Sequence, residues 1–446
     1  MLDNAYKLSH FKYLKIALPF MLSMLTQPLL GVVDTAVVGQ LESPIFIAGV
    51  SIGTTIFNTI YWIFGFLRVS TTSYSAQSVG SKNNKDKLEA FIHPFIMAFI
   101  IGVLLVILQK PLWIMAMKIL SPENLVKEQA SIYYFTLIIG APFVLVNYVI
   151  LGWLMGQSKV KESVIMQVIG NLINIILDII LVKVFNMNVL GVALATLTSQ
   201  VITTIIGTVV MVKCSGLKKE DIFNKSIWNK KDVVRELLVS RDFIIRTICL
   251  LIVNNMFIAT SSTLGTVVLA SNTIILQFES IISYIFEGLA NASSIFSGKA
   301  IGDRNNKLLQ LTIIRTLQWS IVVMVSLTIG YIFIRERILF LFTNIDEVIQ
   351  CVKTYDSWII IYPSVACLGL TFYGVFSGAM ATKAIRNSTF ISMVIFMIAC
   401  KISIPNFGNH GLWLSFITYY FSRTIFLIIY LKSLYIEEET EFIDNV

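Results

Sequence analysis

The repeated stretch that decides the architecture reads IAGVSIGTTIFNTIYWIFGFLRVSTTSYSAQSVG at residues 47–80 and LASNTIILQFESIISYIFEGLANASSIFSGKAIG at residues 269–302. A shift of 222 positions aligns the two copies without a gap, and it also aligns Asn83-Asn84-Lys85 with Asn305-Asn306-Lys307. A polar loop that matches in register is harder to attribute to chance than similarity between two apolar helices. The chain is therefore predicted to contain two copies of one unit.

Composition indicates that these units lie in a membrane. Hydrophobic residues make up 56% of the 446-residue chain and charged residues only 13%. Apolar runs long enough to cross roughly 30 Å of hydrocarbon recur along the chain, and each must be helical to satisfy its backbone hydrogen bonds. The sequence predicts an all-α integral membrane protein with about twelve spanning helices, at roughly 13–38, 45–74, 91–115, 130–155, 162–184, 189–212, 242–264, 270–297, 310–334, 354–380, 386–403 and 411–432.

Charge patterning predicts the topology. Most of the 34 Lys and Arg residues fall in loops on the side of both termini, which predicts that both ends are cytoplasmic and that the chain lies in the cytoplasmic (inner) membrane. The net charge of +8 is thus explained by topology, and no nucleic-acid partner is expected. We expect an N-terminal six-helix bundle at residues 1–212, a cytoplasmic connector at 213–241 and a C-terminal six-helix bundle at 242–446. An even number of helices separates the two copies, so the repeat is parallel, with both copies in the same orientation across the membrane. Transporters with such repeats bind substrate at the interface between the two copies, and substrate is expected there in this protein.

The chain carries no signature of an enzyme or a metalloprotein. Its five cysteines are scattered without a C-x-x-C pair, and its three histidines are dispersed without H-E-x-x-H. It also lacks G-x-x-x-x-G-K-[ST], so an ATP-driven pump is not supported. We expect no enzymatic activity, no cofactor and no resident metal.

Two intramembrane aspartates are the main candidate site. Asp34 in the first helix and Asp178 in the fifth both fall about 8–9 Å below the predicted outer end of their helix. Asn174 lies on the same helical face as Asp178, and Tyr133 and Thr196 are predicted in the outer part of neighbouring helices. Charged groups at this depth are costly, so such a constellation is typical of a proton or cation site. The alternative is a polar cluster that only holds helices together.

Three further residues in the predicted helices are candidates. Glu279 and Glu287, eight residues apart in the eighth helix, can both face a cavity, or they can pair with Arg68, Arg246 or Arg315. Pro19 interrupts the hydrogen bonds of the first helix upstream of Asp34 and permits a bend.

The segments PLLGVVDTAVVGQL (28–41) and FGFLRVSTTSYSAQSVG (64–80) resemble the paired signatures of the multidrug and toxic compound extrusion (MATE) family, particularly its DNA-damage-inducible-F-type branch. This resemblance implies twelve helices in two pseudo-symmetric bundles, a MOP-type transporter fold, and antiport of amphipathic, often cationic compounds against H⁺ or Na⁺. It also implies a coupling site and a bending proline, here Asp34, Asn174, Asp178, Tyr133, Thr196 and Pro19. Ser70, Ser73 and Met155 depart from the branch pattern, which leaves the substrate range open.

The coupling ion is expected to be H⁺, because two carboxylates at one depth of a low-dielectric bundle disfavour full ionisation. Na⁺ is the alternative, with Asp34, Asn174, Asp178 and Thr196 as its oxygen ligands. A lipid-linked precursor flippase is a further alternative, although such proteins tend to line the cleft with several basic residues. The expected partners are membrane lipids and small amphipathic substrates, and the protein is expected to act as a monomer.

Overall fold

The computed structural model describes residues 8–38, 44–215, 230–342 and 345–435; the side chains of residues 25–38, 84, 215, 230–236, 336–338 and 340–342 lie outside this description. Every regular element within these ranges is a helix. The helices are α1 (His10–Val38), α2 (Pro44–Phe64), α3 (Phe66–Ser81), α4 (Asn84–Ile107), α5 (Gln109–Leu120), α6 (Asn124–Leu137), η2 (Ile138–Gly140), α7 (Ala141–Gly156), α8 (Val160–Asp178), η3 (Ile179–Val184), α9 (Asn188–Ser215), α11 (Lys230–Thr263), α12 (Thr266–Gly302), α13 (Asn306–Phe342), α14 (Asp346–Tyr355), α15 (Ser357–Gly378), α16 (Thr382–Tyr430) and η5 (Leu431–Leu434).

The predicted twelve crossings are confirmed. Ten segments of the described chain are long and apolar enough to span a bilayer, and the last of them is Thr382–Leu434. Within it, Gly408 has a non-helical φ of 53°, and the Ser403 and Ser415 hydroxyls approach to 2.9 Å. Residues twelve apart in a straight helix would be about 18 Å apart, so the chain folds back here and makes two crossings. Helix α1 supplies the remaining crossing.

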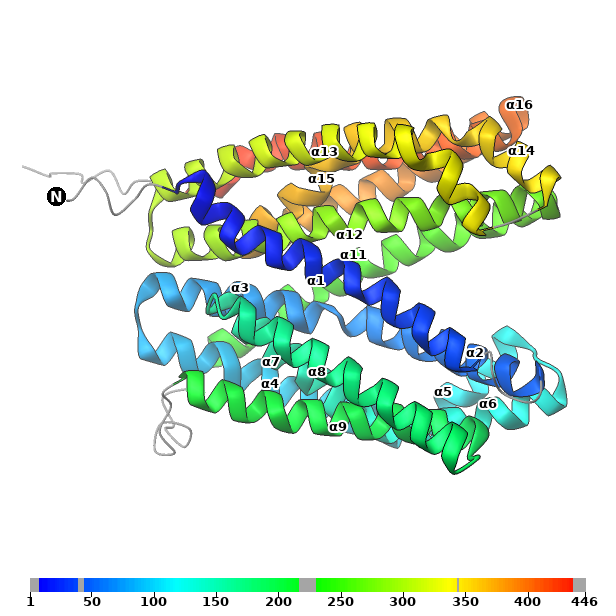
Figure 1. Cartoon of the computed structure of the whole chain (residues 1–446). Coiled ribbons are helices and arrows are strands. Elements are labelled where there is room, and N and C mark those ends of the chain that lie inside the picture. Colours follow the sequence, from blue (N-terminus) through cyan, green and yellow to red (C-terminus); the bar gives the residue numbers. More distant parts are fainter. Residues whose placement is uncertain (1–7, 39–43, 216–229, 343–344, 436–446) are drawn as a thin grey trace, which may run out of the picture.

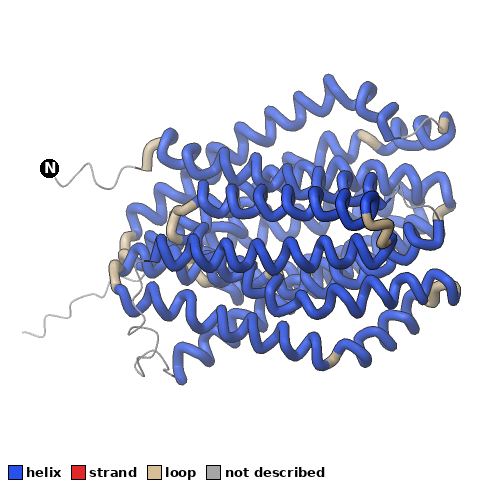
Figure 2. Tube along the Cα trace, turned by 60° about the horizontal axis from the view of Figure 1, so that its bottom comes forward, coloured by secondary structure: helices blue, strands red, loops and turns tan. Residues whose placement is uncertain are grey.

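The helices form two bundles that run side by side (Figure 1). Helices α2 to α9 make up the N-lobe, in which α3 packs against α4 and α7. Helices α11 to α16 make up the C-lobe, in which α12 packs against α13 and α15. The helix axes lie nearly along one direction in the second view (Figure 2), as expected for a bundle that crosses a membrane.

The 222-residue repeat reappears in the packing of the two lobes. The Ser75 hydroxyl donates to the Trp153 carbonyl at 2.9 Å, and Ser297 donates to the Val375 carbonyl at 2.7 Å. Both residues of the second pair are displaced by 222 positions from the first. Equivalent close helix contacts occur where Gly152 meets the Arg68 carbonyl and where Gly374 meets the Ala290 carbonyl. The two bundles are therefore pseudo-symmetric, as predicted.

The lobes meet at the predicted cytoplasmic end of α3 and α12. A Cβ at Gly80 would overlap the Lys299 carbonyl, and a Cβ at Gly302 would overlap the Gln77 carbonyl. These two contacts are also related by the 222-residue shift, so they lie on either side of the pseudo-twofold axis. The Gln77 amide adds a hydrogen bond of 2.9 Å to the Gly378 carbonyl. In this conformation the backbones of the two lobes touch at that end.

Helix α1 passes from one lobe to the other (Figure 1). Near its start the Tyr13 hydroxyl lies 2.8 Å from that of Ser293 on α12, and the backbone of Met21 packs against Gly288. Helix α1 also contacts α2 and α8 of the N-lobe. The first part of α1, which includes Pro19, is thus held on the C-lobe, while the part that carries Asp34 reaches the N-lobe.

Several helix boundaries differ from the predictions, and two of the differences are the most informative. The predicted second helix is two helices, α2 and α3, which meet at Gly65, and α11 begins at Lys230 rather than near residue 242. Residues 230–241 are helical because the segment contains no proline or glycine to stop the helix. The rest of the predicted connector, residues 216–229, lies outside the described residues. The predicted domain boundaries themselves stay predictions.

Candidate functional site

Helix α8 turns both of its predicted site residues toward the protein interior. Its buried positions, Val160, Ser163, Met166, Gly170, Asn174 and Asp178, follow a spacing of three and four residues. Asn174 and Asp178 expose only 7% and 2% of their surface, whereas Leu172 and Ile176 on the other side are exposed. The helix therefore buries one face against the bundle and places a carboxylate and a carboxamide on that face.

The backbone changes its winding directly after Asp178. Residues Ile179–Val184 form a π-helix, η3, before α9 begins. Single turns of π-helix are rare and occur frequently at functional sites. The change lies where the sequence predicted the cation site.

Helix α9 supplies the neighbouring hydroxyl. The Asn174 amide donates to the Thr196 hydroxyl at 3.4 Å, and that hydroxyl donates to the Val192 carbonyl at 3.0 Å. One turn before Asn174, Gly170 lets the two helices approach, because a Cβ there would meet the Thr203 hydroxyl at 2.5 Å. The structure thus brings Asn174 and Thr196 together, with Asp178 one turn further along α8.

Tyr133 on α6 is buried, with 6% of its surface exposed. Its hydroxyl accepts a hydrogen bond of 3.4 Å from Thr54 on α2, and Gly53 packs directly on its ring. Helix α6 also contacts α9, which carries Thr196. Tyr133 therefore links α2 to the helices of the candidate site.

Asp34 lies in α1, but its side chain lies outside the described part of the structure. Its proposed pairing with Asp178 therefore stays a prediction. The backbone of α1 does pack against α8, so the two helices that carry the aspartates are neighbours. Pro19 lies within the continuous helix α1.

A second buried carboxylate lies in the C-lobe. Glu279 on α12 exposes 8% of its surface, and its Oε1 accepts three hydrogen bonds. The donors are the hydroxyls of Tyr362 at 2.6 Å, Ser283 at 2.9 Å and Tyr420 at 3.1 Å. They come from α12, α15 and α16, so Glu279 joins three helices of this lobe through one oxygen.

Glu287 has a different environment. Its carboxylate forms an ion pair of 3.0 Å with Arg68 on α3 of the N-lobe, and its side chain is 38% exposed. Of the two interpretations that the sequence left open for Glu287, the structure thus shows pairing with an arginine. Arg246 instead stacks over the Tyr373 ring at 4.4 Å, and Arg315 donates to the Leu8 carbonyl at 3.0 Å.

Four groups in these clusters were not predicted from the sequence: Thr54, Ser283, Tyr362 and Tyr420. Ser283 lies four residues after Glu279, so the spacing of a helix could have predicted that the two side chains are neighbours. The two tyrosines lie more than 80 residues from Glu279 along the chain, in helices that contain several other aromatic residues. Only tertiary packing identifies them.

Twelve crossings in two pseudo-symmetric bundles, each with a buried carboxylate, define a multi-pass membrane transporter. The MatE family model matches residues 19–180 and 243–402, one segment in each lobe. The chain therefore belongs to the MatE family, whose members are transporters and not enzymes.

Individual relatives agree with this assignment. The chain is 32% identical over 403 residues to DNA damage-inducible protein F of Escherichia coli (strain K12), which covers 90% of this chain and 87% of that protein. Among solved structures it resembles a multidrug resistance MATE family transporter of the MOP superfamily in an outward-facing conformation, with a TM-score of 0.84, 19% identity and coverage of 95% and 96%. A MATE structure in a bent conformation gives a TM-score of 0.85, 19% identity and 95% coverage of both chains.

Proposed function

We propose that this protein is a cation-coupled antiporter that exports amphipathic, often cationic compounds by alternating access. It acts as a monomer in the cytoplasmic membrane, with both termini on the cytoplasmic side. The observation that carries the proposal is the almost complete burial of Asp178 within a membrane-spanning helix, one turn from the bonded pair Asn174 and Thr196. A carboxylate is costly in this position, so it is retained for a use such as binding a cation.

The proposed coupling ion is H⁺. A proton requires only a carboxylate that can be neutralised, whereas Na⁺ requires several close oxygens around a charge that persists. When Asp34 or Asp178 takes up a proton, its attraction for a cationic substrate weakens and the substrate is released. The anchoring of residues 13–21 of α1 on the C-lobe supports bending of this helix near Pro19 as the linked movement.

Sodium coupling is the alternative that a specific observation favours. The Asn174 and Thr196 side chains lie 3.4 Å apart and offer oxygens close to Asp178. The flippase alternative has less support, because Arg68, Arg246 and Arg315 are each engaged by a partner within the protein.

Reconstitution of the purified protein tests the proposed function. Proteoliposomes are expected to move a fluorescent lipophilic cation against its gradient when an ion gradient is imposed, and empty liposomes are not. Movement of a lipid-linked oligosaccharide without movement of the fluorescent cation would instead support the flippase alternative.

Replacement of Glu279 is expected to change substrate preference more than ion dependence. Glu279→Gln keeps the shape of the side chain but removes the charge that three hydroxyl donors now surround. We expect transport of cationic substrates to fall relative to neutral ones, because a buried negative charge inside the C-lobe favours cations. The measurement compares uptake of a matched cationic and neutral dye under each ion gradient.

Tyr420→Phe provides the control for this experiment, because it removes one donor and leaves the carboxylate in place. It is expected to shift the preference less than Glu279→Gln does. An equal loss for every substrate and every ion gradient would contradict the division of roles between the two lobes.

A further inference from the structure

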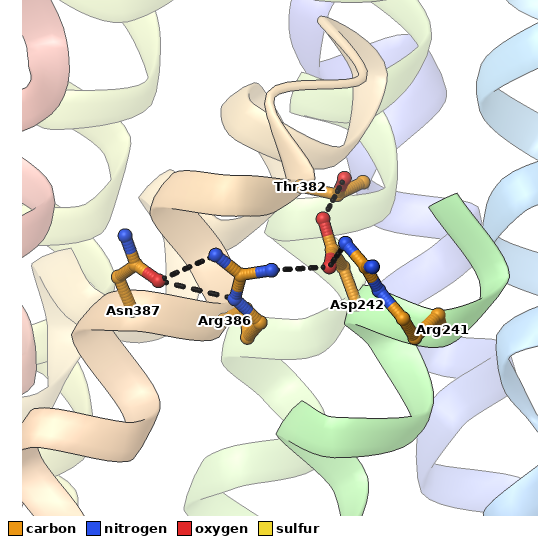
Figure 3. Close-up of polar contacts among 5 residues, drawn as sticks. All are labelled: Arg241, Asp242, Thr382, Arg386 and Asn387. Atoms are coloured by element: carbon orange, nitrogen blue, oxygen red, sulfur yellow. Dashed lines mark hydrogen bonds and ion pairs between the residues drawn. The ribbon is translucent and has the colours of Figure 1, made fainter. Parts of the chain in front are cut away.

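A polar cluster at the predicted cytoplasmic end of the C-lobe is not used by the proposed transport mechanism. Asp242 on α11 is buried, with a side chain only 3% exposed, and its carboxylate accepts hydrogen bonds from two helices. The donors are Arg386 at 2.8 Å and Thr382 at 3.0 Å on α16, and Arg241 at 3.2 Å on α11 (Figure 3). These three donors surround the single negative charge of Asp242.

Part of this cluster is structural. The bonds from Arg386 and Thr382 to Asp242 join the first half of α11 to the start of α16. Asn387 orients the Arg386 guanidinium, because its side-chain oxygen accepts hydrogen bonds of 3.1 and 2.9 Å from two nitrogens of that group. These contacts explain why Asp242 and Arg386 are present.

They do not explain Arg241. Its bond to Asp242 joins adjacent residues of one helix and therefore cannot hold two helices together. Its side chain is 52% exposed, and Lys383 beside it is also exposed. Arg241 and Arg386 both bind the Asp242 carboxylate, and Lys383 adds a third cationic side chain to the lining of the same cavity. The cluster therefore carries a net positive charge that its internal contacts do not neutralise.

This charge borders a cavity of about 470 Å³. Its walls are partly polar, with Arg241, Lys383 and Asn387, and partly apolar, with Leu238, Val239 and Met380. Leu238 is 48% exposed, so the apolar wall opens outward. The cavity thus combines a cationic region and an accessible apolar region within one hollow.

The position of the cavity identifies the kind of ligand. Its lining residues come from the beginnings of the spans Leu237–Thr263 and Thr382–Leu434 and from the end of the latter, where Tyr430 lies. Span ends lie at the level of lipid headgroups, where aromatic side chains are also enriched. Basic pockets between helices on the cytoplasmic side suit anionic headgroups, and an exposed apolar wall suits acyl chains.

We propose that this cavity binds an anionic phospholipid, whose phosphate contacts Arg241 and Lys383 and whose acyl chains lie along Leu238 and Val239. The bound lipid stabilises the junction of α11 and α16, since it neutralises the excess charge around Asp242. The sequence that follows η5, residues 436–446, is rich in glutamate and is the competing candidate for the same cationic region.

Lipid binding to the full-length protein tests this proposal. Purified protein is titrated with phosphatidylglycerol or with phosphatidylcholine in mixed micelles, and bound lipid is counted by native mass spectrometry alongside the melting temperature. Phosphatidylglycerol is expected to bind and to raise the melting temperature. In the double variant Arg241→Gln/Lys383→Gln its affinity is expected to fall about thirtyfold, because each basic side chain near an anionic lipid contributes on the order of a fivefold factor.

The matched control is Lys85→Gln/Lys159→Gln, which removes the same charge from exposed N-lobe positions at the same end and is expected to leave the affinity unchanged. Both double variants retain Asp242 and Arg386, so the helix junction stays intact. Equal loss in the two double variants, or equal binding of phosphatidylcholine, would overturn the proposal. So would stabilisation by inorganic phosphate alone, or phosphatidylglycerol binding that occurs only after residues 436–446 are deleted.

Discussion

Asp178→Asn is expected to abolish substrate export while the protein remains folded and inserted. Asparagine has almost the same volume as aspartate, so the buried face of α8 keeps its packing, but the side chain no longer takes up or releases a proton. Removal of a charge from the membrane interior does not lower the free energy of unfolding, because burial disfavours the charged form. The expected result is normal expression and melting temperature with transport at the level of empty liposomes.

Related substitutions sharpen this prediction. Asp34→Asn is expected to be equally damaging, and Asn174→Ala less damaging, since it removes one hydrogen bond of 3.4 Å and no charge. Asp346→Asn serves as a matched control, because Asp346 is an exposed aspartate at the start of α14. Full transport by a well-expressed Asp178→Asn variant would show that the coupling site lies elsewhere.

Gly302→Leu is expected to stop transport for a different reason. In the present conformation a Cβ at this position would overlap the Gln77 carbonyl of the other lobe, and a carbonyl in a helix cannot move aside. Overpacking of this kind costs about 1–3 kcal/mol. A cost of that size changes the ratio of two conformations by about 5- to 150-fold. Here it lowers the population of the conformation in which α3 and α12 touch, relative to one in which they are apart.

Cysteine accessibility detects this shift. A cysteine placed near the lobe contact, in a background without the five native cysteines, is expected to react faster with a polar thiol reagent when Gly302→Leu is present. Gly330→Leu is the matched control, because within the described residues a Cβ at Gly330 on α13 would meet no atom of another helix within 4 Å. If Gly302→Leu transports normally, closure of the lobes at Gly80 and Gly302 is not required for the cycle.

The sequence predicted those features that periodicity and charge determine. The 222-residue repeat predicted the two pseudo-symmetric lobes, because both copies are visible in the sequence. The lengths of the apolar runs predicted the twelve crossings, because each spanning helix must be apolar along its own length. The four-residue spacing of Asn174 and Asp178 placed both on one buried face of α8. The break at Gly65 was not predicted, because a single glycine within an apolar run does not by itself end a helix.

Contacts between distant helices were beyond the sequence. Nothing local connects Glu279 to Tyr362 and Tyr420, or chooses Arg68 over the other arginines as the partner of Glu287. Likewise, no periodic pattern in the sequence predicts the contact between Tyr13 and Ser293, which holds the start of α1 on the C-lobe. Such pairs follow from how the bundles pack once each helix has formed.

The most direct test of the proposed mechanism imposes one gradient at a time. A fluorescent cationic drug is added outside inverted membrane vesicles that contain the protein, and its uptake is measured. One sample has a pH gradient at equal sodium, and the other has a sodium gradient at equal pH. We predict that the pH gradient alone drives uptake, that the Asp178→Asn variant abolishes it, and that sodium alone has no effect. Uptake driven by sodium at equal pH and indifferent to the pH gradient would contradict proton coupling and assign the Asp178 site to Na⁺.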